Sequence, residues 1–414
     1  MNWSVKLWDE NGNGGEISHS FFEMGLPNAS DWKAKWITGN YKVKKNERYP
    51  VDCFRKKLSV TRSVKSARLY ITACGLYEAR LDGKKIGDFC LAPGHTDYRK
   101  RVQYQTYDVT EMLSQGDHSL TVQLADGWYR GSTGAWGIRN QYGTETKLMA
   151  QLEITYADGK QATIITDGSW GWSNDGPIRF ADNKDGEVVN ANREPSYSGK
   201  AKATNHQVIP TASNNVSVTE HEQFTPTVSK SPNGKWLLDF GQNIAGYVSF
   251  RIQANAGQKL TFRFGELLDE EGNLTLKNIQ CISKEKASPL QQIIYTCREG
   301  WNDYKTTFAV FGFQYAEVDT DIEWLFKTMC GIRVDGEDHF TIAPKPGGSF
   351  TYAKVCYRSV YGIVESGWKN IDDAIIYSVT VPANTGATII LPSGERHILS
   401  AGDYEFRISC RSLQ

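Results

Sequence analysis

The hydrophobic pattern of this chain changes from a strand period to a helix period at one place. In residues 311–321 apolar and polar side chains alternate, as in a half-buried strand. Residues 322–332 then carry apolar side chains at the spacing i, i+3, i+4 and i+7 of an amphipathic helix. A single helix between β-sandwiches has little to pack on. The pattern therefore predicts the last piece of a helical domain whose body is absent.

The first 31 residues predict one β-hairpin. Residues 3–8 alternate, residues 11–14 form an Asn-Gly-Asn-Gly turn, and the chain returns through residues 17–25. Two strands are not a stable unit in water. We therefore expect this hairpin to be a fragment of a domain.

The rest of the chain predicts three β units. From residue 32 to 202, short alternating segments are separated by turns such as Asp82-Gly83, which is typical of a sandwich or jelly roll. A Ser-, Thr-, Asn- and Pro-rich stretch from 203 to 232 indicates a linker and edge segment, and opens a second β-sandwich that extends to 320. After the helix, residues 334–414 form a third. The expected fold class is mainly β, with tandem sandwich or jelly-roll domains and one short helix near 322–331.

Composition narrows the classes of partner. Lys+Arg and Asp+Glu both total 47 in 414 residues, so the formal net charge is zero. This balance gives no electrostatic reason to expect nucleic acid or an anionic membrane as partner. Apolar runs such as residues 387–392 are too short to span a bilayer.

The cysteines and the N-terminus predict a cytoplasmic location. The first residues lack a basic start followed by an apolar block, so no signal peptide is predicted. The eight cysteines are scattered without a CxxC pair, which favours free thiols in a reducing compartment.

The motif Asp-Gly-Trp-Tyr-Arg-Gly at 126–131 is a candidate carbohydrate-binding site, expected in a loop at the end of a strand. An aromatic face stacks on the apolar side of a sugar ring, while Asp and Arg bind hydroxyls. The structural alternative is a Trp plug at the sandwich edge with the arginine in a local ion pair. The candidate contacts, including one further tryptophan, are Asp126, Trp128, Tyr129, Arg130 and Trp136.

No catalytic residue, metal or cofactor is predicted from motifs. The carboxylates Glu266, Asp269, Glu270 and Glu271 surround what is typically a solvated turn. The chain has no P-loop, no HExxH and no GxSxG, and its histidines are isolated. His95 follows an Ala-Pro-Gly turn and could face a ligand, although a turn histidine is the commoner outcome.

Six segments of the chain form a recognisable set: DWKAKWI (31–37), LAPGHTDYRKRVQYQTYDVT (91–110), LADGWYRGSTGAWG (124–137), DGEVVNANRE (185–194), DFGQNIAGYV (239–248) and FTIAPKPGGSFTYAKVCYRSVYG (340–362). In this order and spacing they resemble the accessory domains of bacterial α-L-rhamnosidases. The resemblance covers nearly the whole chain and implies the tail of a fibronectin-like domain at 1–31, a jelly-roll N-domain at 32–202, a concanavalin-like sandwich at 203–320 and a C-terminal sandwich at 334–414.

The resemblance also implies what is missing. The family carries a large (α/α)6 barrel between its last two sandwiches, and the barrel supplies the catalytic carboxylates through a run resembling DCPQRDERxGWxGD. That run is absent here, and residues 321–333 resemble the final barrel helix. Relatives of the N-domain include calcium-dependent rhamnose-binding modules with an Asp-Asn pair. Cys74-Gly75 stands at the nearest counterpart, so no calcium site is expected.

Three hypotheses follow. The chain is a barrel-less relative of the α-L-rhamnosidases that does not hydrolyse rhamnosides alone, because an inverting glycosidase needs two carboxyls about 6.5–9.5 Å apart. Alternatively, it is a non-catalytic module that binds rhamnose-containing glycosides. The third hypothesis is a gene remnant without activity. In each case, loss of the barrel is expected to expose apolar surface and promote self-association.

Overall fold

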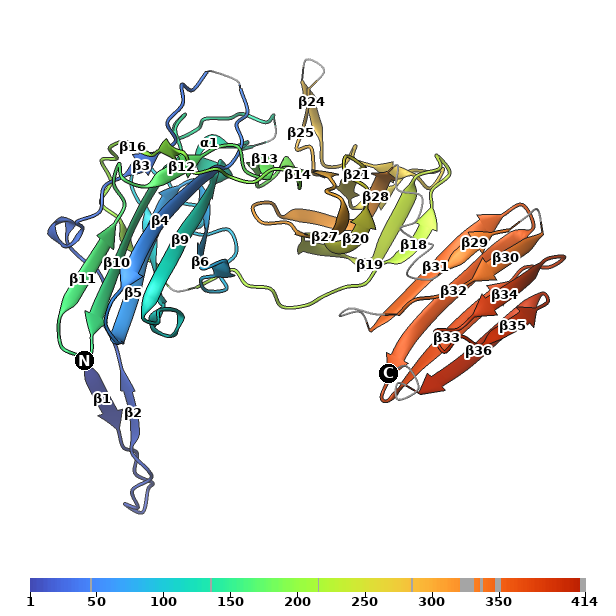
Figure 1. The fold of residues 1–414 in the computed structure, drawn as a ribbon, viewed down its shortest axis with the longest axis horizontal. Coiled ribbons are helices and arrows are strands. Elements are labelled where there is room, and N and C mark those ends of the chain that lie inside the picture. Colours follow the sequence, from blue (N-terminus) through green and yellow to red (C-terminus); the bar gives the residue numbers. More distant parts are fainter. Residues whose placement is uncertain are drawn as a thin grey trace.

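The structure is a row of three β units with a projecting hairpin at the N-terminus (Figure 1). It confirms the predicted mainly β fold class. Residues 321–330 of the expected helix lie outside the described residues, whereas residues 332–333, which the prediction grouped with this helix, belong to strand β29 (Ile332–Val334). This computed structural model describes residues 1–44, 47–134, 136–214, 216–283, 286–320, 331–335, 338–346 and 351–409.

The predicted N-terminal hairpin is confirmed. Strands β1 (Asn2–Val5) and β2 (Ser18–Phe21) pair antiparallel and form a two-stranded sheet. The Asp9 carboxylate fixes the turn, since it accepts hydrogen bonds from the backbone N–H of Asn11 (2.9 Å) and Asn13 (2.7 Å).

The first unit is a sandwich of two sheets around an apolar core that includes Phe54, Ile71 and Trp170. Its predicted Asp82-Gly83 turn is present, and both residues have the positive φ that such a turn requires (51° and 81°). Two 3-10 turns, η1 (Ala29–Asp31) and η2 (Thr110–Met112), flank its strands. One sheet runs β16 (Lys202–Ala203), β3 (Ile37–Thr38), β10 (Lys147–Tyr156), β5 (Val64–Cys74), β8 (Gln103–Asp108), β17 (Thr211–Ala212), with β11 (Gln161–Ile165) paired to β10. The other runs β15 (Gly199–Lys200), β12 (Gly171–Ser173), β4 (Asp52–Val60), β9 (Gly116–Ala125), β6 (Leu76–Leu81), β7 (Lys84–Lys85).

An eleven-stranded sheet runs through the second and third units. Its order is β13 (Ile178–Asp182), β14 (Gly186–Asn190), β26 (Gln292–Thr296), β21 (Lys259–Gly265), β28 (Phe311–Thr320), β19 (Trp236–Gly246), β18 (Thr227–Lys230), β31 (Tyr352–Ser359), β32 (Gly362–Ile371), β33 (Ala374–Val381), β36 (Gly402–Ser409). The smaller sheets are β20 (Ser249–Ala254) with β27 (Gly300–Lys305), β22 (Leu267–Leu268) with β23 (Leu274–Thr275), β24 (Cys281–Ser283) with β25 (Lys286–Ser288), and the third unit's second sheet of β29 (Ile332–Val334), β30 (His339–Ile342), β34 (Gly386–Ile390) and β35 (Arg396–Leu399).

The second and third units meet at one strand pair. Val228 of β18 lies opposite Val355 of β31 in a parallel register, and it packs against the cores of both units. The third core includes Phe340, Trp368 and Tyr377. Backbone pairing and a shared apolar contact therefore join these two units.

Strand pairing places residues 178–190 with the second unit, although the sequence pattern had grouped them with the first. β14 pairs in parallel with β26, from Gly186 opposite Gln292 to Asn190 opposite Thr296. Alternation along the chain identifies a strand but does not say which sheet receives it, and this explains the difference.

The polar stretch after residue 202 connects the first two units along their surface. Its strand β17 extends the edge beside β8, and the Val218 carbonyl accepts a hydrogen bond from the Cys90 N–H (2.8 Å). Glu220 then forms an ion pair with Lys305 of the second unit. Among the helices that the structure describes, none has the length and apolarity to cross a membrane.

Candidate functional site

The predicted sugar-binding motif forms a one-turn helix, α1 (Gly127–Arg130), and not a loop as expected. The turn is closed by hydrogen bonds from Arg130 N to Asp126 O (3.1 Å) and from Gly131 N to Gly127 O (3.0 Å). Gly127 has φ +51°, and a Cβ there would lie 2.6 Å from Leu76 Cγ. Glycine at this position therefore lets the chain leave β9 in direct contact with the core.

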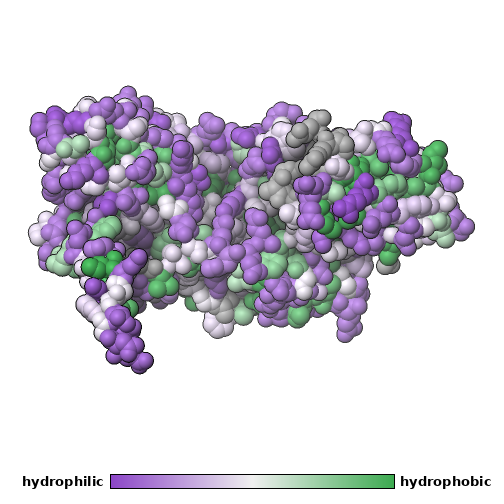
Figure 2. All heavy atoms as spheres, turned by 90° about the horizontal axis from the view of Figure 1, so that it is seen from below, coloured by the Kyte–Doolittle hydropathy of each residue, from purple (hydrophilic) through white to green (hydrophobic). Residues whose placement is uncertain are grey.

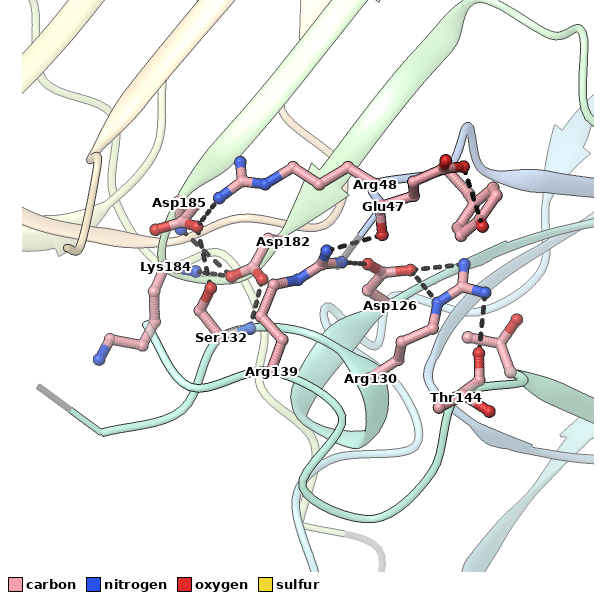
Figure 3. Close-up of polar contacts among 12 residues, drawn as sticks. Glu47, Arg48, Asp126, Arg130, Ser132, Arg139, Thr144, Asp182, Lys184 and Asp185 are labelled. Carbon is pink, nitrogen blue, oxygen red and sulfur yellow. Dashed lines mark hydrogen bonds and ion pairs between the residues drawn. The ribbon is translucent and has the colours of Figure 1, made fainter. Parts of the chain in front are cut away.

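Asp126 and Arg130 form a buried ion pair on this turn (Figure 3). The Arg130 guanidinium donates to Asp126 Oδ1 at 2.7 Å, and each residue is only 2% exposed. A second guanidinium, from Arg139, pairs with Asp126 Oδ2. Arg130 also donates to the Tyr41 hydroxyl (2.6 Å). The motif arginine thus satisfies its hydrogen bonds within the protein.

The segment after α1 is bound to the second unit through the turn between β13 and β14. Asp182 Oδ2 accepts from the Ser132 N–H (2.5 Å), and Asp185 Oδ2 accepts from the Ser132 hydroxyl (2.9 Å). Lys184 Nζ donates to the Gly134 carbonyl (2.6 Å), and Arg48 pairs with Asp185. These contacts form a polar seam between the first two units (Figure 3).

Three buried carboxyl groups near this seam have raised pKa values. Burial raises the pKa of Asp52 to about 6, and burial with the neighbouring Asp185 charge does the same for Asp182. Burial also raises the pKa of Glu187 to about 6. A raised pKa is typical of a catalytic acid. These three residues, however, are at most 1% exposed, and internal donors occupy them.

The five predicted contact residues do not share one surface. Tyr129 is 4% exposed, so it is buried with Asp126 and Arg130, whereas Trp136 is 65% exposed. Trp128 is half-buried and packs against two apolar clusters. The ion pair of Arg130 is the arrangement that the structural alternative described. Sugar binding by these residues stays a prediction, and Trp128 and Trp136 alone are accessible for it.

An aromatic surface beside α1 is the better candidate for binding a sugar. We define the aromatic ledge as His95, Arg99, Trp128 and Tyr142. Its ring centroids lie 5.6 Å apart for His95 and Trp128 and 6.3 Å apart for His95 and Tyr142. The Arg99 guanidinium lies 5.3 Å from the Tyr142 ring centroid. His95 and Arg99 are exposed and the other two residues are half-buried.

Sequence reasoning named His95 as a residue that could face a ligand, with a turn histidine as the commoner outcome, and it missed Arg99 and Tyr142. Buried tyrosines support the ledge from below, because the Tyr98 ring lies 5.2 Å from that of Tyr142 and 5.3 Å from that of Tyr129. The chain from His95 to Arg99 and the chain around Tyr142 are far apart in sequence. Their meeting depends on tertiary packing, for which the sequence held no local signal.

Two cavities open elsewhere on the molecule, and neither brings two carboxylates together. One of about 440 Å³ lies at the base of the N-terminal hairpin and is lined by Phe22, Glu23, Met24, Gly25, Leu26, Pro27, Tyr104, Thr211 and Ala212. The other, of about 430 Å³, is lined by Arg263, Asp269, Leu274, Thr275, Leu276, Lys277, Gln280 and Ile282.

The acidic turn at 269–272 is solvated, as the sequence indicated. Glu270 and Glu271 are exposed, and Asp269 accepts a hydrogen bond from the Asn273 N–H (2.7 Å). Over the part of the chain that the structure describes, no three His, Cys, Asp or Glu side chains gather in a way that could hold a metal ion.

Comparisons with known proteins identify the three units. The bacterial α-L-rhamnosidase N-terminal domain matches residues 62–230, the concanavalin-like domain matches 229–334, and the C-terminal domain matches 334–404. The chain belongs to the bacterial α-L-rhamnosidase family. Within this rhamnosidase-family chain, the aromatic ledge and, apart from Arg48, the polar seam lie in the region of the N-terminal domain match.

Relatives agree with this assignment. An α-L-rhamnosidase of Streptomyces avermitilis is 36% identical over 271 residues, which are 62% of this chain and 25% of the relative. The crystal structure of an Aspergillus terreus α-L-rhamnosidase superposes with a TM-score of 0.69 at 30% identity, covering 77% of this chain and 38% of that one. A Streptomyces avermitilis α-L-rhamnosidase complexed with L-rhamnose gives a TM-score of 0.61 at 35% identity, covering 66% and 27%. The chain thus spans only about a quarter to two fifths of these proteins.

Proposed function

We propose that this chain is a non-catalytic set of α-L-rhamnosidase accessory domains, which does not cleave rhamnosides alone. The observation that carries the proposal is that the matches to the concanavalin-like and C-terminal domains meet at residue 334. The resemblance places the catalytic barrel between these two domains. No stretch of this chain remains there to form one.

The chemistry of the described carboxyl groups supports the same proposal. An inverting glycosidase holds a protonated acid and a carboxylate base on opposite sides of the sugar, about 6.5–9.5 Å apart with water between them. The carboxyl groups with raised pKa values are Asp52, Asp182 and Glu187, and they are inaccessible to a sugar because they are buried and hydrogen-bonded.

Incubation of the purified chain with p-nitrophenyl α-L-rhamnopyranoside is expected to release no p-nitrophenol above the protein-free background. A catalytically complete family member, assayed in parallel, supplies the positive control. Since glycosidases accelerate hydrolysis by many orders of magnitude, even about a millionth of ordinary enzyme activity is informative. A saturable rate that scales with protein concentration through a second purification step would contradict the proposal.

A second candidate function is rhamnoside binding at the aromatic ledge. The observation that favours it is the grouping of exposed and half-buried rings at His95, Trp128 and Tyr142 beside the charged Arg99. A sugar stacks its apolar face on such rings, and a guanidinium can donate to its hydroxyls. A homologous structure contains L-rhamnose, which makes this sugar the first ligand to test.

Calorimetric titration of the chain with methyl α-L-rhamnoside is expected to give weak, millimolar binding. His95→Ala should weaken it by up to about tenfold, since loss of one aromatic contact costs about 1 kcal/mol. Trp301→Ala is the matched control, because Trp301 is an exposed aromatic side chain of β27, outside both the ledge and the predicted sugar-binding residues. Absence of heat at millimolar sugar, or an equal loss in both variants, would count against the ledge.

Two further properties are part of this proposal. We infer a cytoplasmic location because Cys53, Cys74, Cys90 and Cys281 form no disulfide. We also infer that the surface which the barrel covers in larger relatives favours self-association. A remnant without selected activity is the reading that remains if neither sugar binding nor a partner is found.

A further inference from the structure

The N-terminal hairpin carries an exposed apolar face. In the register of β1 and β2, Trp3 lies opposite Ser20 and Val5 opposite Ser18, so these side chains share one face of the sheet. Alternation places Met1 and Leu7 on the same face, and Phe22 lies beside Met1. We define the hairpin apolar face as Met1, Trp3, Val5, Leu7 and Phe22, whose exposed fractions are 79%, 46%, 41%, 73% and 50%.

At the base of the hairpin Phe22 lines a cavity together with Tyr104 and Thr211, whereas Met1, Trp3, Val5 and Leu7 stay exposed. β1 and β2 form a sheet of their own, and the hairpin stands away from the first unit (Figure 1). In Figure 2 it projects below that unit, with a hydrophilic tip and apolar atoms nearer its base. A two-stranded sheet is marginal in water, and an apolar row of this kind marks an interaction site.

We propose that the hairpin apolar face binds the same face of a second copy of this chain. Its polar positions, Ser18 and Ser20, are small and carry no charge, so two such faces can approach without burying an ionised side chain. A two-fold axis between them makes the contact closed and self-complementary. The two hairpins then form a two-layer, four-stranded sandwich, in which each hairpin covers the apolar face of the other.

The available area fits a weak dimer. Aromatic side chains bury roughly 150–250 Å² each, and this face holds Trp3 and Phe22 together with three aliphatic side chains. A contact of roughly 500 Å² per copy reaches the lower end of specific interfaces, near 1,000 Å² in total. Affinity in the micromolar range is therefore expected.

The hairpin is also pre-organised for this contact. The Asp9 carboxylate binds the N–H groups of Asn11 and Asn13 and the Asn13 side-chain amide (2.8 Å), which fixes the turn and with it the strand register. At the other end, Leu26 N donates to the Tyr104 hydroxyl (2.8 Å) and anchors the hairpin on the first unit. Little conformational entropy is then lost on association.

Sedimentation velocity between 1 and 200 µM tests the proposal. The unmodified chain should shift from monomer to dimer, and Trp3→Ser should weaken association at least tenfold. Phe21→Ser is the matched control, because Phe21 is 62% exposed and lies on the opposite face, paired with Asn2. This control should dimerise as the unmodified chain does. In the unmodified chain and in Phe21→Ser, hydrogen exchange of the β1 amides should slow as the protein concentration rises.

Three outcomes overturn the proposal. The first is an unmodified chain that stays monomeric at 200 µM with unchanged exchange in β1. The second is full dimerisation of Trp3→Ser, which would mean that the copies meet elsewhere, for example at the barrel-facing surface. The third is dissociation of Phe21→Ser to the same extent as Trp3→Ser, which would make the contact nonspecific. Because neither substituted side chain lies in a core, the melting temperature of both variants should match that of the unmodified chain.

Discussion

Replacing Asp126 with alanine is expected to lower the free energy of unfolding by about 3–5 kcal/mol. The carboxylate is 2% exposed and pairs with both Arg130 and Arg139. Its removal leaves the Arg130 guanidinium buried without its counter-charge, and the hydroxyl of Tyr41 cannot replace an anion. Urea unfolding followed by circular dichroism measures the change.

A matched exposed pair provides the control for this substitution. Asp158 pairs with Arg62 on the surface, where both side chains are more than 40% exposed. Asp158→Ala should therefore leave the urea midpoint almost unchanged. If the two alanine variants were equally stable, the buried pair would not be the element that holds α1 in place. A large loss in Asp126→Asn as well would identify charge, and not volume, as the cause.

The burial of Asp126 also decides what the motif at 126–131 does in the structure. Aromatic and charged residues in the run Asp-Gly-Trp-Tyr-Arg-Gly suggested a sugar site, yet Tyr129 and Arg130 are buried and Asp126 holds two guanidinium groups. The motif thus forms a buried ion-pair network beside the polar seam. Of the motif residues, Trp128 alone is partly accessible to a ligand, and it belongs to the neighbouring aromatic ledge.

The fold was largely predictable from local patterns. Alternation and turn residues identified the first hairpin and the turn at Asp82-Gly83, because both features depend on adjacent residues. The assignment of 178–190 to the first unit differed from the observed pairing, since β14 joins β26 more than a hundred residues later. Nothing within either strand specifies that partner.

The candidate site was less predictable than the fold. The five candidate residues were predicted from their chemistry, but burial decides which of them a ligand can reach, and burial is set by packing against distant segments. Arg139 is an example, since it closes the Asp126 ion pair from a separate loop. Tyr142 is another, because only its contact with Tyr98 brings it beside His95.

A methyl group added at Gly186 is expected to push apart strands β14 and β26, which pair within the eleven-stranded sheet. We expect Gly186→Ala to cost about 3–5 kcal/mol, because its φ is +103° and an added Cβ would lie 1.7 Å from the Gln292 carbonyl oxygen. That oxygen belongs to the parallel partner strand, so β14 and β26 must move apart. Limited proteolysis should then cut near residue 186 faster than in the unmodified chain.

Gly234→Ala is the control that separates the clash from backbone strain. Gly234 also has a positive φ, +84°, but no heavy atom lies within 4 Å of an added Cβ. It should cost only about 1 kcal/mol and leave the cleavage pattern unchanged. Equal losses in the two variants would assign the effect to φ alone. A much larger loss of unfolding free energy at Gly186 would assign the effect to the close approach of β14 and β26. Because Asp182 and Asp185 of the polar seam lie just before β14, this approach would then also hold the seam in place.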